Sequence, residues 1–377
     1  MNRSFERKNL KDIKRIIIKV GSRVLASPSS GLNLEAFASI TRQISSLIEK
    51  EKEVILVTSG AIAAGMRKMG LKIRPRTIPE QQAAAAAGQS HLMHIYEEFF
   101  SHYNQKVAQV LLTHNDLANR DRFIHARNTL KTLLSYNIIP IINENDSVVV
   151  EEIKFGDNDN LSALITNLVD AELLLILSDV EGLYETDPKK DSNASLISVV
   201  SKVDKYLEKI DKRTKEGLGR GGIYTKLKAA KKAAHYGIPT IVASGYIHDV
   251  ILRIIDGEEI GTLFLPEKEA LPSRKHWIAY ALKPCGEVIV DEGAKNAICN
   301  NGKSLLPSGV VDVKGNFKRG DLISCIGPDG KEFARGLALY SKDEIQKIKG
   351  VKTKDIINIL GFKYYDEIIH RDDLVIL

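Results

Sequence analysis

The chain has 377 residues, of which 44% are hydrophobic and 27% are charged. This balance is ordinary for a globular protein, and the length indicates two domains. The longest apolar runs are far shorter than the ~20 residues that a membrane-spanning helix needs. The N-terminus is charged and has no apolar signal core. We therefore expect a cytoplasmic protein with no membrane partner.

Cysteine usage and charge exclude further classes of protein. The three cysteines are an odd number and lack Cys-x-x-Cys spacing, so neither a disulfide framework nor a zinc site is indicated. The net charge of +6 permits an anionic partner, but the charges are interspersed rather than gathered in blocks. Charge alone therefore identifies no binding surface.

The first two thirds of the sequence alternate short β-branched runs with helical patterns. Strands are predicted over 15–20, 54–58, 107–112, 138–142, 173–177 and 240–243, and helices over 34–52, 79–103, 121–136, 161–169 and 224–236. Near-continuous apolar strands between helices predict a mostly parallel sheet covered on both faces. In such a sheet, ligands bind beyond the carboxyl ends of the strands.

The pattern changes after residue 266. Residues 272–275 are typical of a linker, and short strands follow at 287–290, 309–313 and 321–325, divided by turns rich in glycine and asparagine. We therefore predict an α/β domain over 1–270 and a small β-rich domain over 271–377.

An alanine run, 83–87, lies inside one of the predicted helices. Alanine is the best helix former and permits close helix packing. We interpret the run as structural rather than as a binding site.

Small and charged residues follow two of the predicted strands. Lys19 ends the first strand before Gly21 and Ser22, an arrangement that lets backbone amides approach an anion. Ser59 and Gly60 follow the second strand, at the start of a helix whose N-terminal amides favour an anion. The alternatives are a strand-end lysine that reaches into solvent and a serine that only caps the helix.

Two clusters of acids and amides lie further along the chain. Residues 143–146 read Asn-Glu-Asn-Asp, and residues 156–160 read Gly-Asp-Asn-Asp-Asn before an apolar helical run. With the separated lysines Lys19 and Lys226, these acids and amides suggest phosphate chemistry.

Two further segments imitate nucleotide-binding motifs. Residues 217–222 fit G-x-G-x-x-G, but the charged stretch before them is not a strand, as a Rossmann fingerprint requires. Gly302, Lys303 and Ser304 resemble the end of a Walker A loop, but Ala297 stands where that loop needs glycine. We interpret the second segment as a turn, and the first could still wrap phosphates.

Six motifs occur in the order expected of one known family: Lys-x-Gly-Ser, Val-Thr-Ser-Gly-Ala-Ile-Ala, Ile-Asn-Glu-Asn-Asp, Gly-Asp-Asn-Asp-Asn-Leu-Ser-Ala, Asp-x-x-Gly-Leu-Tyr and Gly-x-Gly-x-Gly-Gly-x-x-Thr-Lys. Together they resemble the amino acid kinase family over residues 14–264, and within it the glutamate 5-kinase branch. The tail, with His-Arg-Asp-Asp at 370–373, resembles the PUA domain of many such kinases. The resemblance implies an α/β fold: an amino acid kinase-like sandwich with a mostly parallel central sheet covered by helices, plus a small C-terminal β-rich PUA domain.

The resemblance also implies an activity and a set of site residues. The γ-phosphoryl group of ATP would pass to the side-chain carboxylate of L-glutamate, giving L-glutamyl 5-phosphate in the first step of proline biosynthesis. The residues implied for catalysis are Lys19, Lys226 and Asp159, with Asp159 anchoring both ammonium groups. Those implied for glutamate are Ser59, Asp146 and Asn158, with Asp146 on the α-ammonium group. Those implied for the nucleotide are Lys19, Ser178, Asp179, Arg220, Gly221, Gly222, Ile223, Tyr224, Thr225 and Lys226.

The chain departs from the family pattern at three of these positions. Ser178 stands where threonine is common, and Arg220 and Tyr224 stand where small hydroxyl residues are usual. Mg²⁺ is expected on the phosphate oxygens, with no dedicated set of protein ligands. The loop's own contacts with nucleotide are left open by the sequence.

The resemblance implies partners as well. We expect a homo-oligomer and a functional link to glutamyl phosphate reductase. RNA binding by the PUA-like domain is the less favoured alternative, because 17 Lys/Arg against 14 Asp/Glu from Arg274 onward and a single tryptophan suit RNA poorly. The rival enzymes are kinases of the same fold that act on acetylglutamate, aspartate, carbamate or a nucleoside monophosphate.

Overall fold

The computed structural model describes residues 5–27, 31–73, 75–118, 120–148, 158–186, 188, 191, 193–215, 222–266 and 284–377. These residues form two units, which are described separately. The predicted boundary between residues 270 and 271 lies outside the described residues, so the two domain ranges stay predictions.

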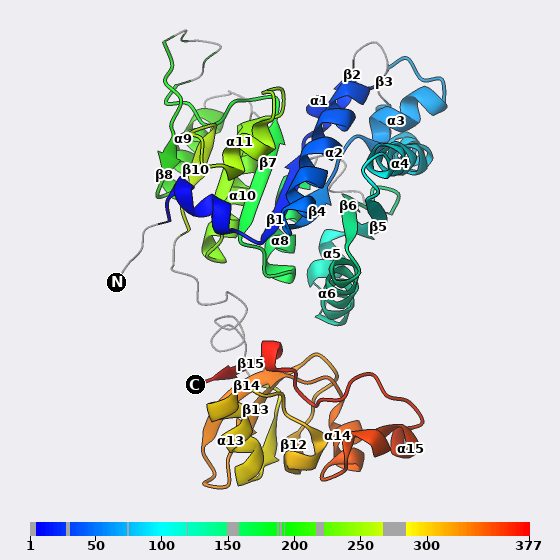
Figure 1. The fold of residues 1–377 in the computed structure, drawn as a ribbon, viewed down its shortest axis with the longest axis vertical. Helices are drawn as coiled ribbons and strands as arrows, with labels where there is room; N and C mark the ends of the chain where they lie inside the picture. The colour runs from blue at the N-terminus through cyan, green and yellow to red at the C-terminus, as the bar shows by residue number, and fades with distance from the viewer. Residues whose placement is uncertain are drawn as a thin grey trace. The chain divides into compact units, whose positions relative to one another are not determined.

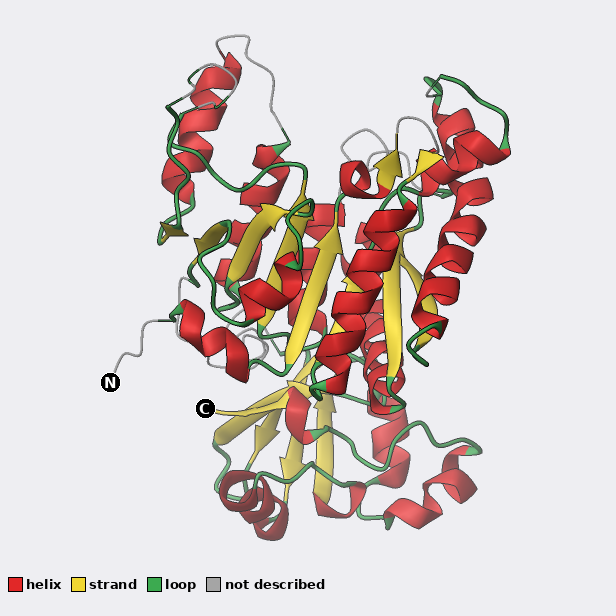
Figure 2. Ribbon diagram, turned by 45° about the horizontal axis from the view of Figure 1, so that its top comes forward, coloured by secondary structure: helices red, strands yellow, loops and turns green. Residues whose placement is uncertain are grey.

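An eight-stranded sheet forms the centre of the first unit (Figures 1 and 2). Its strands are β1 (Arg15–Val20), β4 (Glu53–Val57), β5 (Lys106–Leu112), β6 (Ile138–Glu144), β7 (Leu173–Ser178), β8 (Val199–Val200), β9 (Thr240–Ser244) and β10 (Thr262–Phe264). They lie in the order β5-β6-β4-β1-β7-β9-β10-β8, and only the β9–β10 pair is antiparallel. The predicted mostly parallel sheet is confirmed, and all six predicted strands belong to it.

Helices cover both faces of this sheet (Figure 2). The helices of the first unit are α1 (Ser22–Leu25), α2 (Leu34–Glu49), α3 (Ala61–Lys68), α4 (Ile78–Ser101), α5 (His114–Ala118), α6 (Arg120–Ser135), α8 (Asn158–Leu168), α9 (Asp204–Lys215), α10 (Ile223–His235) and α11 (Val250–Ile255). A hairpin of β2 (Ala26–Ser27) and β3 (Gly31–Leu32) and the 3-10 helix Arg7–Asp12 complete the unit.

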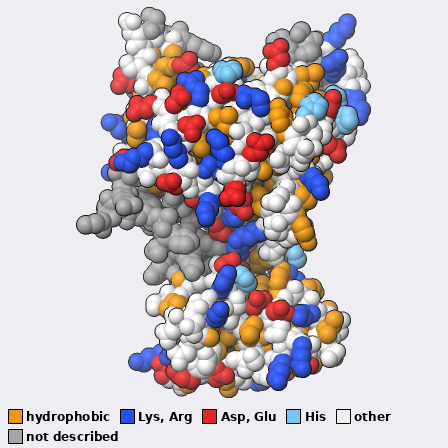
Figure 3. Space-filling model, in the orientation of Figure 1, with side chains coloured by type: hydrophobic (Ala, Val, Ile, Leu, Met, Phe, Trp, Pro, Cys, Tyr) orange, Lys and Arg blue, Asp and Glu red, His pale blue; other side chains and the backbone are white. Residues whose placement is uncertain are grey.

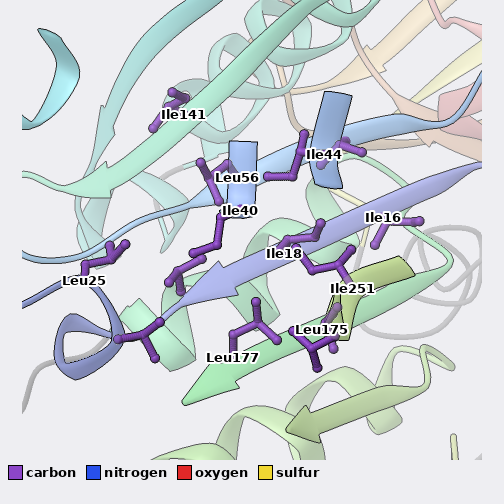
Figure 4. Close-up of a cluster of buried hydrophobic side chains, with 14 of the residues drawn as sticks. Ile16, Ile18, Leu25, Ile40, Ile44, Leu56, Ile141, Leu175, Leu177 and Ile251 are labelled. Carbon is purple, nitrogen blue, oxygen red and sulfur yellow. The ribbon is translucent and has the colours of Figure 1, made fainter. Parts of the chain in front are cut away.

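Strand β1 divides its side chains between the two layers of helices. Ile16 and Ile18 belong to the buried cluster that also contains residues of α2 and α11 (Figure 4). Successive side chains of a strand point to opposite faces, so Lys19 lies on the other face, where α8 contacts β1. Strand β1 therefore packs apolar side chains into the core on one face of the sheet and presents Lys19 on the face covered by α8.

Helices α3 and α4 touch each other through their backbones. A β-carbon built on Gly65 would lie 1.7 Å from the carbonyl oxygen of Ala84, and one on Gly88 would lie 1.9 Å from that of Ala61. Ala84 is fully buried at this contact. The predicted close helix packing is confirmed at Ala84, since small residues permit this approach.

The second unit has a five-stranded sheet of order β12-β11-β13-β14-β15. Its elements are β11 (Gly286–Val290), α13 (Glu292–Asn301), β12 (Val310–Gly315), β13 (Leu322–Ile326), β14 (Glu332–Leu337), α14 (Lys342–Ile348), α15 (Ile356–Leu360) and β15 (Leu374–Ile376). The β11–β13 pair is parallel and the other pairs are antiparallel. Acidic and basic side chains are interspersed on the face of this unit that Figure 3 shows.

The segment that resembles the end of a Walker A loop lies in this second unit. Gly302 follows the last residue of α13 with a left-handed φ of 57°, whereas a P-loop lysine precedes a helix. Lys303 and Ser304 line a cavity of about 610 Å³ with Asp291, Leu306, His370 and Arg371 among its other residues. The prediction of a turn rather than a P-loop is confirmed.

Candidate active site

A carboxylate between two lysines forms the centre of the site. Lys19 Nζ lies 2.5 Å from Asp159 Oδ1, and Lys226 Nζ lies 3.2 Å from Asp159 Oδ2. All three side chains are buried: Lys19 is 5% exposed, Asp159 2% and Lys226 8%. The structure thus brings together all three residues predicted for catalysis, and Lys19 does not reach into solvent.

Three elements distant in sequence hold this cluster. Lys19 lies near the carboxyl end of β1. Strand β1 itself lies between β4 and β7 in the sheet (Figure 1). Asp159 lies in the first turn of α8, where the helix dipole favours a carboxylate. Lys226 lies in the first turn of α10, which packs against α8. The cluster therefore sits where a parallel sheet places its ligands.

The protonation states follow from burial and from the surplus of positive charge. Burial by itself raises the pKa of Asp159, but the charges of Lys19 and Lys226 outweigh it and hold the pKa at about 2. Burial lowers the pKa of Lys226, and the nearby Lys19 charge lowers it further against the opposing effect of Asp159. With one carboxylate for two ammonium groups, the cluster is suited to accept an anion.

This arrangement predicts an alkaline limb in the pH profile. The resemblance implies that Lys226 holds the phosphates of ATP, a role that needs its protonated form. We therefore expect kcat/KM for ATP to fall with rising pH at a pKa below the ordinary 10.5. Activity is present below that pKa and lost above it. Initial rates at subsaturating ATP would measure the limb, with circular dichroism to verify that the fold persists. Lys226→Arg should move the limb upward, since guanidinium stays charged; an unmoved limb would contradict the assignment.

Amides and a hydroxyl group adjoin the cluster. Asn158, the residue before Asp159, donates through Nδ2 to Ser59 Oγ at 3.2 Å and to Asn143 Oδ1 at 3.0 Å. Ser59 does not cap α3, since Gly60 occupies the N-cap position with φ 102°. The interpretation of Ser59 as only a helix cap is therefore wrong, because its hydroxyl faces Asn158. Asp146 lies in the turn after β6 and is partly exposed.

The carboxyl end of β7 carries the other predicted pair. Ser178 is 2% exposed, and its hydroxyl donates to Asp179 Oδ1 at 3.0 Å. Partial burial raises the pKa of Asp179, but hydrogen bonds from Arg23 and Ser178 outweigh it and lower the pKa. Arg23 Nη1 donates to Asp179 Oδ2 at 2.5 Å from a largely exposed side chain. Asp179 is therefore ionised beside an accessible guanidinium group.

The glycine-rich loop is described only from Gly222 onward, so Arg220 and Gly221 lie outside the described residues. The element before it is helix α9, which ends at Lys215; the prediction that this loop does not follow a strand is confirmed. Gly222 is the N-cap of α10, and its carbonyl accepts from Lys226 Nζ at 3.2 Å. Ile223 opens that helix.

Tyr224 and Thr225 follow in the first turn of α10. Tyr224 is 8% exposed, with Lys228 Nζ 4.7 Å from the centre of its ring. Thr225 Oγ1 donates to Asp159 Oδ2 at 2.7 Å. Tyr224 is therefore largely buried, and Thr225 adds a hydrogen bond to one oxygen of the Asp159 carboxylate.

The sequence did not identify three other residues of this region. Asn143 is 1% exposed and joins Asn158 to Gln89 of α4, with Asn143 Nδ2 donating to Gln89 Oε1 at 2.8 Å. Arg23 joins α1 to Asp179. Asn143 stands in a cluster that the sequence singled out, whereas Gln89 and Arg23 stand in helices without a polar pattern to mark them.

The part of the chain that the structure describes contains no group of three or more His, Cys, Asp or Glu side chains placed to hold a metal ion. Among those same residues, no helix combines the length and the apolar character needed to cross a membrane.

Comparison with known proteins agrees with this geometry. The profile of the amino acid kinase family matches residues 14–244, and that of the PUA domain matches residues 286–360. A glutamate 5-kinase from Geobacter sulfurreducens is 53% identical over 98% of this chain and 99% of its own length. One from Thermoanaerobacter pseudethanolicus is 50% identical over 96% of this chain and 98% of its own. The chain therefore belongs to the amino acid kinase family, within its glutamate 5-kinase branch.

Proposed function

We propose that this chain transfers the γ-phosphoryl group of ATP to the side-chain carboxylate of L-glutamate, forming L-glutamyl 5-phosphate for proline biosynthesis. The observation that carries the proposal is the buried cluster of Lys19, Asp159 and Lys226. Asn158, next to Asp159 in the chain, contacts Ser59, and the charge of Asp179 acts on Lys226. A phosphoryl group that moves between two anionic oxygens needs such fixed positive charge.

The chemistry requires no general base. A carboxylate with the ordinary pKa of glutamate is ionised at neutral pH, so its oxygen attacks the γ-phosphorus directly while the bond to the β,γ-bridging oxygen breaks. Lys19 would neutralise charge on the transferring group from the glutamate side, and Lys226 from the nucleotide side. Asp159 would position both ammonium groups, which its two oxygens contact. Catalysis is then a matter of alignment and charge.

The acceptor side would select free glutamate. Ser59 and Asn158 would contact the substrate, and Asp146 would pair with its α-ammonium group. N-acetylation removes that positive charge, and with it the attraction between the ammonium group and Asp146. The site would therefore discriminate against N-acetylglutamate.

The nucleotide side would use Ser178 and Asp179 near adenine and ribose, and the 220–226 segment around phosphate. Mg²⁺ would be coordinated by the phosphate oxygens of the nucleotide rather than by Asp159, because each oxygen of Asp159 already contacts a lysine or threonine side chain. Bound there, the ion would neutralise phosphate charge.

Three further proposals come from the family rather than from the geometry. The chain would form a homo-oligomer, would act in the cytoplasm, and would be linked functionally to glutamyl phosphate reductase. The last follows from chemistry, since an acyl phosphate in water needs prompt consumption.

The test is ATP turnover with Mg²⁺ and hydroxylamine, which traps an acyl phosphate as a hydroxamate. L-Glutamate, N-acetylglutamate and aspartate would be compared at equal concentration. We expect hydroxamate from glutamate, with at least about tenfold less from N-acetylglutamate. A product from N-acetylglutamate or aspartate in preference to glutamate would assign the chain to a rival kinase, and no acyl product from any acid would refute the activity.

A further inference from the structure

A chain of three side-chain amides runs away from the catalytic cluster, and its direction is fixed. Asn158 Oδ1 accepts from the backbone N–H of Glu144 at 3.3 Å. A backbone N–H can only donate, so this contact requires the oxygen of Asn158 and turns its Nδ2 the other way. That Nδ2 then donates to Asn143 Oδ1. The orientation of Asn158 is thus set by the backbone.

The orientation of Asn158 also fixes which atoms of the next two amides donate and which accept. Because Asn143 presents its oxygen to Asn158, it presents Nδ2 to Gln89, whose Oε1 accepts at 2.8 Å. Reversing Gln89 alone would place two donors face to face. The chain must therefore end in a donor, Gln89 Nε2.

This terminal donor is buried and lacks a protein partner. Gln89 Nε2 has no hydrogen bond among the described residues, although its atom is inaccessible to solvent. Buried N–H groups in folded proteins are nearly always paired, and an unpaired one is costly. An acceptor that arrives with a ligand would complete the chain.

Helix packing fixes the place of Gln89. Its neighbour Gly88 contacts the carbonyl of Ala61 at the start of α3, two residues after Ser59. Gln89 is therefore held beside the carboxyl ends of β4 and β6. Asn158 adjoins Asp159 in the chain, Asn143 contacts Asn158, and Gln89 is the last of the three amides.

We propose that Gln89 is a further substrate-binding residue, whose Nε2 donates a hydrogen bond to the α-carboxylate of bound glutamate. The inference rests on the proposed function. The acceptor is a carboxylate because the chain offers a donor, and it is the α-carboxylate because the side-chain carboxylate must lie at Lys19 and Lys226.

Kinetics of Gln89→Glu test this inference. The variant keeps the shape and the oxygen that accepts from Asn143, but replaces the donor with an oxygen that repels the substrate. We expect KM for glutamate to rise at least about tenfold, while KM for ATP and the melting temperature stay near the wild-type values. Gln89→Met should raise KM for glutamate less, because it adds no repulsion. Gln89→Met also adds no buried charge. It therefore tests the inference even if Gln89→Glu does not fold.

The control is Gln81→Glu, the same substitution eight residues earlier on α4, where the amide contacts the carbonyl of Arg76. It should leave both KM values unchanged. An unchanged KM for glutamate in both Gln89 variants would overturn the inference, as would a parallel rise in both KM values with a lower melting temperature. Failure of the proposed function is distinct, since wild-type protein would then show no glutamate-dependent hydroxamate.

Discussion

Lys226→Ala is expected to lower kcat by about 10²-fold or more without unfolding the protein. The ammonium group is held in place before the reaction by Asp159 Oδ2 and by the carbonyl of Gly222. Such a charge needs no reorganisation as the phosphoryl group moves, and water that replaces it in the variant does. The loss should appear in kcat and in KM for ATP, and little in KM for glutamate.

Hydroxamate formation at saturating glutamate would measure this effect. Lys231→Ala is the matched control, because Lys231 lies on the same helix and pairs with Asp204 near the surface. It should retain the wild-type kcat. Lys226→Arg should recover part of the loss, since the charge returns on a differently shaped group. A kcat for Lys226→Ala within threefold of wild type would refute the assigned role.

The cluster should also behave as one unit. Lys19 and Lys226 share a single carboxylate, so removing either leaves Asp159 with a different balance of charge. We therefore expect the double variant to lose less activity than the product of the two single losses. A strictly multiplicative loss would indicate that the two lysines act independently.

Gly65→Ala should lower the free energy of unfolding by at least about 3 kcal/mol. The new methyl group would lie 1.7 Å from the carbonyl oxygen of Ala84 and 2.9 Å from the backbone nitrogen of Gly88. Backbone atoms cannot turn aside as a flexible side chain can, so α3 and α4 would have to separate. The gain in helix propensity, about 1 kcal/mol, is too small to offset this.

Urea denaturation of Gly65→Ala and of a control variant would measure the loss of unfolding free energy. The control is Gly293→Ala, because Gly293 also lies in a helix but its β-carbon would meet only Asp291 Oδ1 at 3.4 Å. This control should be neutral or slightly stabilising. Since α4 carries Gln89, surviving Gly65→Ala protein should also bind glutamate more weakly. Equal stability of the Gly65 and Gly293 variants would mean that the helices do not approach as closely as described.

Local patterns predicted the strands well and singled out the three residues that the structure brings together in one buried cluster. Runs such as Leu173–Ser178 are apolar on both faces because helices cover both, and such runs are legible in sequence. Short motifs of charged and small residues contain Lys19, Asp159 and Lys226. Because these motifs occur in the same order as in the family, the three residues could be matched to family positions. The two-residue strand β8 had no comparable signal, since pairing rather than composition defines it.

The contacts between motifs could not be predicted in the same way. Arg23 meets Asp179 across 156 positions, and Gln89 meets Asn143 across 54. Neither side chain differs in its local pattern from an exposed helical residue. Gln89 is distinguished by the donor and acceptor order of the hydrogen-bonded amides, which the backbone N–H of Glu144 sets. These hydrogen bonds form only when the chain is folded, so the sequence does not show them. The contact of Thr225 with Asp159 was not predicted either, because it arises from the packing of the first turn of α10 against α8.

The position of β1 in the sheet has a consequence for the newly made chain. Its residue Ile16 pairs with Val54 on one side but with Leu173 on the other. Strand β1 therefore lacks its β7 partner until more than 150 further residues have been made. Its exposed edge and apolar side chains are open to wrong partners throughout that interval. Folding dominated by such distant pairings is slow, so chaperones that shield the nascent N-terminal half should raise the yield of folded protein.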